Sequence, residues 1–595
     1  MTTRGSLRLP FRSAVLSVCL SLSLSLSLAL VTSACEQQGV AQSGADMGTD
    51  SAPDLLMPVP LTPGDGHVAD AVIGTLSSVA GGKRGRTWNV STQNLLEGAW
   101  LIQSPPEPTW GLPYSALTLP AACSGAGCSA DFGLRLCTTQ ADCTSGGSCA
   151  PVAASVTTPG GTPTRMCIGH SDHVYEEMYK VLISAQRYAD VTSLLPPDGR
   201  FLSAMRNAVT YLARSGQPVQ ARFLFGNYPA TGGSVDTKAV LTSLTRDIPG
   251  GSQIKVAVGS YRSSNLPPSW NHSKIVAADG RAVIVGGHNL WDAHYLGKNP
   301  VHDVSMRLRG PAAVDAHLFA NEQWSYTCST MNFTYCFVTG SVCAHQYTGG
   351  TIANQCPQGV PAAMLTPDQP GDVRAVAMGR LALIDASNLS NQSDTAFLSM
   401  MGAAQRTIRM AQQDLGPLKI GGVAAGSWPN AVFAQLGAAI VRGVDVYIVL
   451  SNKDSVAGGL SGSEASYSNG WTLEEVGTHI RDYIEQNPPV GAPTGAALRQ
   501  LICQKLHLAP LRFSSEDTFP DGVPLPLHAK FVMIDDQGFY IGSQNQYDAG
   551  LTEYGYLVDD ARAGAAVLRS YWAPLWQSSR RRAISGTEAA SCSLK

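Results

Sequence analysis

The residues with the clearest chemical potential in this chain form a short motif that occurs twice. Both copies follow the pattern H-x-K-x4-D, and both continue with a pair of small residues and an Asn. The first copy comprises His272, Lys274, Asp279, Gly286, Gly287 and Asn289, and the second comprises His528, Lys530, Asp535, Gly542, Ser543 and Asn545. The separation is constant, because 528 − 272 and 545 − 289 both equal 256. Two matched copies predict two half-sites that bring their His, Lys and Asn side chains to one shared pocket.

Each motif is predicted to form a β-hairpin. In the first copy, residues 272–277 are typical of a strand, Asp279-Gly280 of a tight turn, and residues 282–286 of the return strand. Side chains two apart on a strand share a face, so His and Lys should point into the same space. Asp279 and Asp535 are therefore interpreted as structural turn residues. Gly287 and its partner Ser543 are small enough for a ligand or a neighbouring backbone to approach closely.

Two His, two Lys and two Asn suit the chemistry of a phosphodiester. Lysine charge and amide donors can hold the non-bridging oxygens. One imidazole can attack phosphorus while the other protonates the leaving oxygen. Because the two lysines supply the electrophilic charge, we expect no metal and no cofactor to be required. The alternative is a pair of amphipathic hairpins with surface His and Lys, which a matched duplication disfavours.

These residues resemble the signature of the phospholipase D superfamily. The surroundings of both motifs look like the secreted bacterial phospholipases D of the Streptomyces type, over a stretch from about Val68 to about Ser579. The segments that carry this likeness are 269–274, 286–291, 300–304, 310–313, 539–547 and 553–556, with Tyr295-Leu296, Trp572 and Trp576. The resemblance covers most of the chain but is dense only around the motifs.

The resemblance implies a role for each motif residue. His272 would be the nucleophile that forms a phosphohistidine, and His528 would protonate the departing head group and then activate water or an alcohol. Lys274, Lys530, Asn289 and Asn545 would hold the phosphoryl oxygens. Asp303 and Glu553, the acids beyond each Asn, would each orient one imidazole from its far nitrogen. The family commonly has Asp at the second of these positions, so Glu553 departs from its pattern. The plainer interpretation of both acids is a solvated surface carboxylate.

Two aromatic residues beside the motifs are further candidates for substrate contact. Trp291 and Tyr547 could line a choline pocket through cation–π contacts. Core packing is the simpler interpretation of both rings.

The rest of the chain alternates between helix and strand, which predicts an α/β fold. Helices are expected at 173–188, 201–214, 395–404, 428–442, 473–485 and 496–506, and strands at 219–225, 254–258, 407–412 and 444–450. The resemblance implies two similar α/β halves, each a mixed β-sheet flanked by helices, related by a pseudo-twofold axis with the active site at the seam. We place the halves at 67–345 and 370–580, with a linker at 346–369 and a tail at 581–595.

The N-terminus predicts export. Residues 1–34 combine three Arg with an uncharged apolar run and small residues, as in a secretory signal peptide. The following Cys35 resembles a lipidated cysteine, although Thr32 stands where such a signal usually has Leu. Residues 35–66 are typical of a flexible linker. The protein is therefore expected outside the cytoplasm of a bacterium, either secreted or lipid-anchored.

Cysteine usage agrees with an oxidising compartment. The chain has 14 Cys, and six of them cluster within an insert at about 121–170. This insert contains no C-x-x-C pair, so disulfides are favoured over a zinc site. Cys503 and Cys592 stand apart from the clusters, and the sequence does not reveal any pairing.

Composition limits the choice of function. The 595-residue chain is 44% hydrophobic and 14% charged, with a net charge of −3, which suits a folded enzyme and disfavours nonspecific nucleic-acid binding. We therefore expect a phospholipase D that hydrolyses the distal phosphodiester of glycerophospholipids, with phosphatidylcholine favoured, and that also exchanges head groups. Its partner would be a phospholipid membrane surface, and it would act as a monomer with an internal pseudo-dimer. The alternatives are a nuclease or other phosphodiesterase of the superfamily, a phosphatidyltransferase, and a non-enzymatic lipid-binding scaffold.

Overall fold

The computed structural model describes most of the chain after residue 65. The described ranges are 66–105, 128–129, 134–139, 141, 148–151, 165–168, 171–226, 235–261, 269–296, 299–330, 333–339, 342–348, 357, 359–381, 392–420, 423–455 and 469–594. The predicted signal peptide, Cys35 and nearly all of the linker at 35–66 lie outside these residues. Within them, no helix combines the length and the apolar character needed to cross a membrane.

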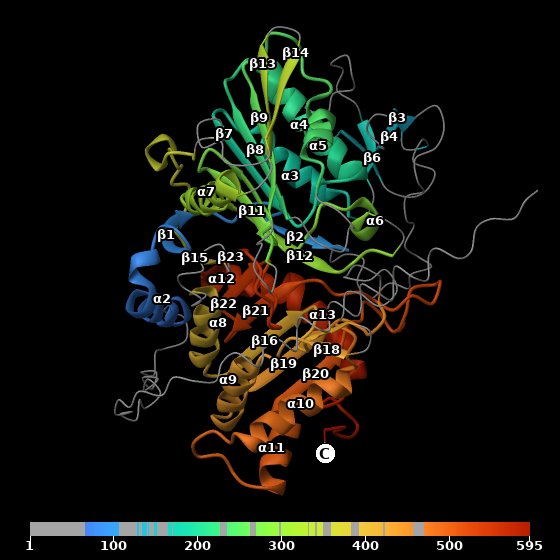
Figure 1. The fold of residues 1–595 in the computed structure, drawn as a ribbon. Coiled ribbons are helices and arrows are strands. Elements are labelled where there is room, and N and C mark those ends of the chain that lie inside the picture. Colours follow the sequence, from blue (N-terminus) through green and yellow to red (C-terminus); the bar gives the residue numbers. More distant parts are fainter. Residues whose placement is uncertain are drawn as a thin grey trace, which may run out of the picture. The chain divides into compact units, whose positions relative to one another are not determined.

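Two mixed β-sheets form the framework (Figure 1). Within the described residues, one sheet has nine strands in the order β14-β13-β9-β8-β7-β10-β11-β12-β2, and the other has eight in the order β1-β15-β23-β22-β21-β16-β19-β20. The strands of the nine-stranded sheet are β2 (Leu101–Ser104), β7 (Tyr188–Ser193), β8 (Gln220–Gly226), β9 (Lys255–Tyr261), β10 (Ile275–Ala278), β11 (Ala282–Gly286), β12 (Asp303–Arg309), β13 (Phe333–Thr339) and β14 (Val342–Thr348). Those of the eight-stranded sheet are β1 (Trp88–Asn94), β15 (Val373–Arg380), β16 (Thr407–Gln412), β19 (Asp445–Leu450), β20 (Leu506–Pro510), β21 (Lys530–Ile534), β22 (Gly538–Gly542) and β23 (Glu553–Asp559).

The two sheets share one topology. In the first, β7, β8 and β9 are parallel, and β10, β11 and β12 continue as an antiparallel meander. In the second, β16, β19 and β20 are parallel, and β21, β22 and β23 form the matching meander. Each copy of the motif lies at the start of its meander. The predicted α/β class with two similar halves is therefore confirmed.

Helices cover the sheets. They are α2 (His67–Ala80), α3 (His173–Ile183), α4 (Gly199–Arg214), α5 (Thr237–Thr245), α6 (Asp292–Tyr295), α7 (Ala312–Thr330), α8 (Gln392–Gly402), α9 (Asn430–Val441), α10 (Leu473–Gln486), α11 (Ala496–Lys505), α12 (Ala561–Val567) and α13 (Ala573–Ser579), with short turns η1 (Gly81–Lys83), η6 (Ala362–Met364), η8 (Leu568–Trp572) and η9 (Arg580–Arg582). Most of the predicted helices are present. The helix predicted at 173–188 is also present but shorter, because α3 ends at Ile183 and Tyr188 begins β7.

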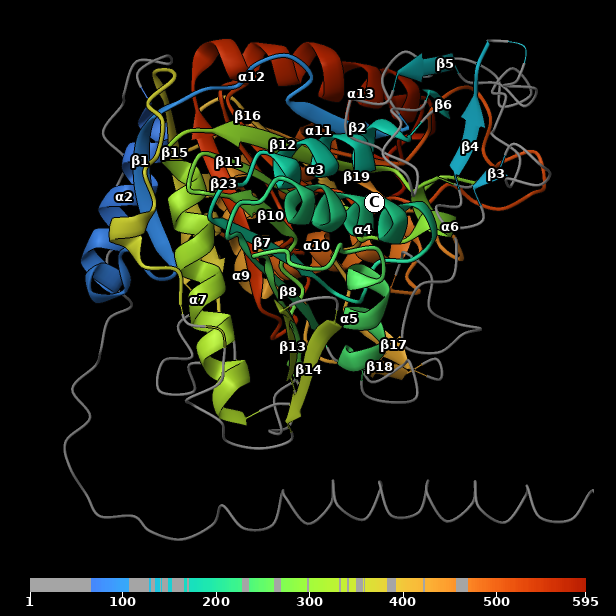
Figure 2. The same ribbon diagram turned by 90° about the horizontal axis from the view of Figure 1, so that it is seen from above.

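Alternate residues of each meander face different cores. On β10, Val276 and Ala278 pack with α3, α4 and α5, whereas Ile275 and Ala277 pack in a core shared by both sheets. On β21, Val532 and Ile534 pack with helices α8 to α11, and Phe531 and Met533 join the shared core. Figure 2 shows α3 and α4 lying over the strands of the first sheet. This two-residue alternation places an apolar layer between the sheets, at whose edge the motifs meet.

The N-terminal boundary of the first half differs from the prediction. Within residues 67–94, which we assigned to that half, β1 joins the eight-stranded sheet by pairing antiparallel with β15. The apolar residues Val68, Val72 and Leu76 of α2 are buried in the core that contains α8. The nine-stranded sheet therefore begins with β2.

The insert near 121–170 carries a small sheet of its own. Within the described residues it has four strands, namely β3 (Cys128–Ser129), β4 (Leu134–Cys137), β6 (Arg165–Ile168) and β5 (Ser148–Pro151), in that spatial order. A further two-stranded hairpin, β17 (Leu418–Ile420) and β18 (Val423–Ala425), follows β16.

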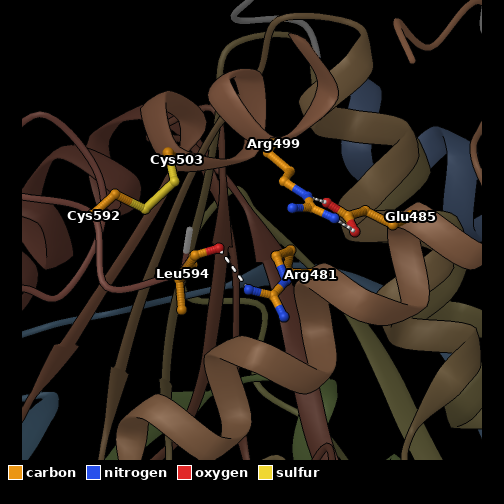
Figure 3. Close-up of a disulfide and its surroundings, with 6 residues drawn as sticks. All are labelled: Arg481, Glu485, Arg499, Cys503, Cys592 and Leu594. Atoms are coloured by element: carbon orange, nitrogen blue, oxygen red, sulfur yellow. Dashed lines mark hydrogen bonds and ion pairs between the residues drawn. A yellow bond between two sulfur atoms is a disulfide. The ribbon is translucent and has the colours of Figure 1, made fainter. Parts of the chain in front are cut away.

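The C-terminal tail packs in the core between the eight-stranded sheet and helices α8 to α11, so the second half extends beyond the boundary that we predicted at 580. Leu594 is fully buried, and the backbone of Ile584 bonds to Leu508 in β20. A disulfide joins Cys503 in α11 to Cys592 (Figure 3). Beside it, the guanidinium of Arg481 donates a 2.9 Å hydrogen bond to the carbonyl of Leu594. The tail is thus fixed to α10 and α11.

Removing this disulfide should destabilise the second half. The crosslink spans 89 residues, for which loop-closure entropy gives about 4.6 kcal/mol. We expect Cys592→Ser to lower the denaturant midpoint and to expose the tail to proteolysis. The Cys503→Ser and double variants should match it, because each breaks the same bond. An unchanged midpoint would show that the noncovalent contacts of the tail suffice.

Candidate active site

The two motif histidines lie together although they belong to different sheets. The ring centroids of His272 and His528 are 6.3 Å apart, with their planes at 72°. Both rings are about 4% exposed. The duplicated motif therefore forms one site, as its repetition predicted.

Each histidine is held by a carboxylate from the other sheet. His272 Nδ1 lies 2.9 Å from Glu553 Oε2, and His528 Nδ1 lies 2.8 Å from Asp303 Oδ2. Both carboxylates are completely buried, so they are not the solvated surface groups of the alternative interpretation. These bonds fix the Nδ1 side of each ring and leave its Nε2 side for chemistry.

Backbone bonds repeat this crossing. The amide of His272 donates to the carbonyl of Thr552, which precedes Glu553, and the amide of His528 donates to the carbonyl of His302, which precedes Asp303. For this reason His272 is not part of a strand: β10 begins at Ile275 rather than at His272 as predicted, and His528 likewise precedes β21. The extended residues before each strand bridge the two sheets.

The lysines and asparagines line the same buried region. Lys274 Nζ donates to the carbonyl of His272 at 2.8 Å, and Lys530 Nζ donates to that of His528 at 2.5 Å. Asn289 has no hydrogen-bond partner on either side-chain atom within the described residues. Asn545 donates to the hydroxyl of Tyr547 at 2.8 Å, while its own oxygen is unpaired there. The two asparagines thus retain hydrogen-bonding capacity that an anion can use.

The motif aspartates lie elsewhere. Asp279 accepts hydrogen bonds from the amides of Gln186, Arg187 and Tyr188 at 2.6–2.9 Å. Asp535 accepts from the amides of Gln405, Arg406 and Thr407 and from His67. Both have a positive φ, 51° and 55°, in the hairpin turns. Their carboxylates secure the entry to β7 and β16, in keeping with a structural function.

The paired positions Gly287 and Ser543 differ in their surroundings. A Cβ on Gly287 would lie 1.9 Å from Asp303 Oδ1, so only glycine fits against this carboxylate. Ser543 has room for its hydroxyl, which donates to Glu553 Oε2 at 2.6 Å. Both residues thus lie against the carboxylates that hold the histidines. The ring of Trp291 lies 4.9 Å from that of His294, at the start of α6.

Two further residues join this arrangement and carried no sequence signal for a role. The buried hydroxyl of Tyr295 donates to Asp303 Oδ2 at 2.9 Å and accepts from the amide of Asn289 at 3.2 Å. The guanidinium of Arg380 lies 3.5 Å from Glu553 Oε1. Tyr295 was noted only as part of the family likeness, and Arg380 lies in no repeated motif.

The two carboxylate–histidine pairs differ in charge. Burial lowers the pKa of His272 to about 4. Burial alone would raise the pKa of Glu553, but His272, Arg380 and Lys274 outweigh it and lower that pKa. Burial raises the pKa of Asp303 to about 7 and lowers the pKa of His528 well below its usual value. His272 is therefore a neutral imidazole beside an ionised acid, whereas the Asp303–His528 pair keeps a transferable proton up to about neutral pH.

Both active-site lysines are buried, which disfavours their charged forms. Burial lowers the pKa of Lys274 to about 8 and that of Lys530 well below its ordinary range. A bound phosphodiester anion would restore their protonation, because an opposite charge nearby favours the charged form. The site is suited to an anion with oxygens to share among two Lys and two Asn.

Several known proteins are similar to this chain. The chain is 28% identical to a phospholipase D of Streptomyces antibioticus over 449 residues, which cover 69% of this chain and 77% of that protein. It is 23% identical to cardiolipin synthase A of Pseudomonas aeruginosa over 288 residues, 47% of this chain and 48% of that enzyme. Among solved structures, phosphatidylserine synthase of Haemophilus influenzae aligns over 68% of this chain and 84% of its own, with a TM-score of 0.43 and 11% identity. No family model matches the chain.

Proposed function

Because the chain belongs to the phospholipase D superfamily, we propose that it is an exported phospholipase D. It hydrolyses the distal phosphodiester of glycerophospholipids, favouring phosphatidylcholine, and it transfers the phosphatidyl group to alcohols. The observation that supports this most directly is the pair of imidazoles 6.3 Å apart, each held on Nδ1 by a carboxylate of the other sheet. In the proposed reaction one phosphorus atom lies between the two rings.

The first step forms a phosphohistidine. His272 Nε2 attacks phosphorus, and a P–N bond forms as the P–O bond to the head group breaks. The ring that results is positively charged, and Glu553 stabilises it through Nδ1–H. The leaving oxygen takes the proton of His528 Nε2, so the Asp303–His528 pair loses one proton.

The second step releases phosphatidic acid. His528 takes a proton from water, the oxygen of which attacks phosphorus as the P–N bond breaks, so both histidines return to their starting states. An alcohol in place of water gives a new phospholipid. Lys274, Lys530, Asn289 and Asn545 hold the phosphoryl oxygens throughout. This scheme requires no cofactor, because the lysines supply the positive charge.

The pH dependence should follow the two pairs. His272 can attack only above its pKa of about 4, and Asp303–His528 can donate only below about 7. We expect kcat/KM for a short-chain phosphatidylcholine to form a bell between these limits. A 4-nitrophenyl phosphodiester, the leaving group of which needs no proton, should lose the descending limb near pH 7 and decline only above about 8, where Lys274 loses its charge. A descending limb of equal depth with both substrates would contradict the assignment of His528 as the acid.

One incubation tests both phospholipid hydrolysis and head-group exchange. We expect the protein from residue 35 onward, incubated with phosphatidylcholine and ethanol, to yield both phosphatidic acid and phosphatidylethanol. Plasmid DNA in a parallel tube should remain intact. Nicked DNA with untouched lipid would instead establish a nuclease, and exchange without hydrolysis would establish a phosphatidyltransferase.

The setting of the reaction is part of the proposal. The enzyme acts as a monomer on a phospholipid membrane surface, outside the cytoplasm, where it is secreted or held by a lipid on Cys35. Its uncharged apolar segment within residues 1–34 and its many cysteines support this address. Labelling with a fatty acid analogue should mark the protein only when Cys35 is present.

A further inference from the structure

Arg380 is a buried cation beside one of the two catalytic pairs. It is the last residue of β15 and is about 4% exposed. Its Nε donates to the carbonyl of Leu551 at 2.9 Å, and its Nη1 donates to Asp394 at 2.9 Å. Its Nη2 has no hydrogen-bond partner within the described residues and lies 3.5 Å from Glu553 Oε1. Two of its three nitrogens are thus fixed, so that the third faces the acid that holds His272.

Asp303, the matching acid, has a different neighbour. Its hydrogen bonds and ion pairs within the described residues are with His528, Tyr295 and the amide of Val304. Where Glu553 has a guanidinium, Asp303 has a neutral hydroxyl. The extra methylene of Glu553 lets one carboxylate bond to His272 through Oε2 and face Arg380 through Oε1. The departure from Asp at this position therefore coincides with an added cation.

On the premise of the proposed function, we propose that Arg380 is a positioning residue that acts through Glu553 to keep His272 uncharged and ready to attack phosphorus. A fixed positive charge behind Glu553 favours its ionised form, so the pair holds only the Nδ1 proton of a neutral His272, and Nε2 keeps the lone pair that attacks phosphorus. No guanidinium is among the described contacts of Asp303, and the charges that act on it come from Lys530 and Lys274. Burial outweighs these lysines, so the Asp303–His528 pair keeps its proton for the leaving group. The two carboxylates thus differ in their neighbours, Arg380 beside Glu553 and Tyr295 beside Asp303. This difference assigns the nucleophile to His272 and the general acid to His528.

The charged groups around the Glu553–His272 pair determine how a substitution of Arg380 should change the proton affinity of this pair. The titratable groups that face Glu553 are His272, Lys274 and Arg380, with the hydroxyls of Tyr540 and Tyr261 nearby. Lys530 also acts on His272, and Asp394 faces Arg380. Removing the charge of Arg380 leaves the lysines in place and raises the proton affinity of the Glu553–His272 pair. Protonation of this pair then blocks attack at a higher pH.

The test is the ascending limb of kcat/KM for a 4-nitrophenyl phosphodiester, which depends on the nucleophile and needs no proton donor. We expect Arg380→Gln to move this limb upward by about one pH unit. Arg380→Lys should restore it, since it keeps the charge. Arg409→Gln is the matched control, because Arg409 pairs with Asp536 on the same sheet without contacting either catalytic pair. A uniform loss at every pH with an unmoved limb would reduce Arg380 to a structural role.

A second variant covers the case in which Arg380→Gln does not fold. The side chain of Asp394 is 42% exposed, and Asp394→Asn removes an anion from Arg380 without touching Glu553. The limb should then move slightly to lower pH, and an upward or absent shift would overturn the proposal. Turnover of the nitrophenyl ester without phosphatidylcholine hydrolysis would reject the lipid assignment and leave the Arg380 test valid. Absence of turnover on both esters would reject the proposed function itself.

Discussion

His272→Asn should abolish turnover and leave no label on the protein after incubation with phospholipid carrying radioactive phosphorus in its phosphate. The asparagine cannot form the P–N bond, and the proposed mechanism assigns the neighbouring His528 to proton transfer. Loss of an enzymatic nucleophile typically lowers kcat by about 10⁴-fold or more. The measurement is the rate of head-group release, together with separation of the protein from lipid under neutral to alkaline conditions, because the P–N bond of a phosphohistidine breaks in acid.

His528→Asn should give the opposite pattern with a reactive ester. A 4-nitrophenolate leaves without a proton, so the phosphohistidine still forms at His272. Its hydrolysis needs the base that has been removed, so labelled protein should accumulate while lipid turnover falls by about 10³-fold. His479→Asn, on the outer helix α10, is the control and should behave as the unmodified protein. Label on His272→Asn but not on His528→Asn would exchange the two roles.

The duplicated motif predicted the content of this site well, because chemistry and spacing both repeat along the chain. Which acid meets which histidine was not predictable from it. Asp303 crosses to His528, and Glu553 crosses to His272. This pairing depends on how two sheets face one another, and no periodicity within one half records that relation.

Other differences have the same origin in long-range contacts. The predicted strand at His272 starts three residues late, at Ile275, because the intervening backbone bonds across to Thr552. Within residues 67–94, β1 joins the second sheet because β15 offers it a free edge, which local patterning within α2 and β1 does not indicate. Motif analysis could not predict the role of Arg380 for a similar reason. Its partner Glu553 is distant in sequence, and a single Arg at the end of a strand does not by itself indicate a function.

Gly287→Ala should be the most damaging of the substitutions that leave every chemical group of the site in place. A methyl group at this position would lie 1.9 Å from Asp303 Oδ1 and 2.7 Å from its Cγ, so the carboxylate must move. Asp303 would then lose its 2.8 Å bond to His528 and its contact with Tyr295. A mis-oriented general acid costs about 10²- to 10³-fold in kcat, whereas KM should change little because the lysines and asparagines remain.

The partner position supplies the control for this experiment. Ser543→Ala keeps a Cβ where one already fits. It removes the bond that the hydroxyl donates to Glu553 and the bond that it accepts from the amide of Tyr554, so we expect a loss of about tenfold. The two variants change small side chains at equivalent places in the repeat. The larger loss of kcat that we expect for Gly287→Ala is therefore attributed to the displacement of Asp303. Folding of both is checked by thermal denaturation, and steady-state kinetics gives kcat and KM separately. If Gly287→Ala retained kcat within threefold of the unmodified protein, the position of Asp303 could not govern proton transfer by His528, and the acid–base half of the mechanism would have to be assigned to another group.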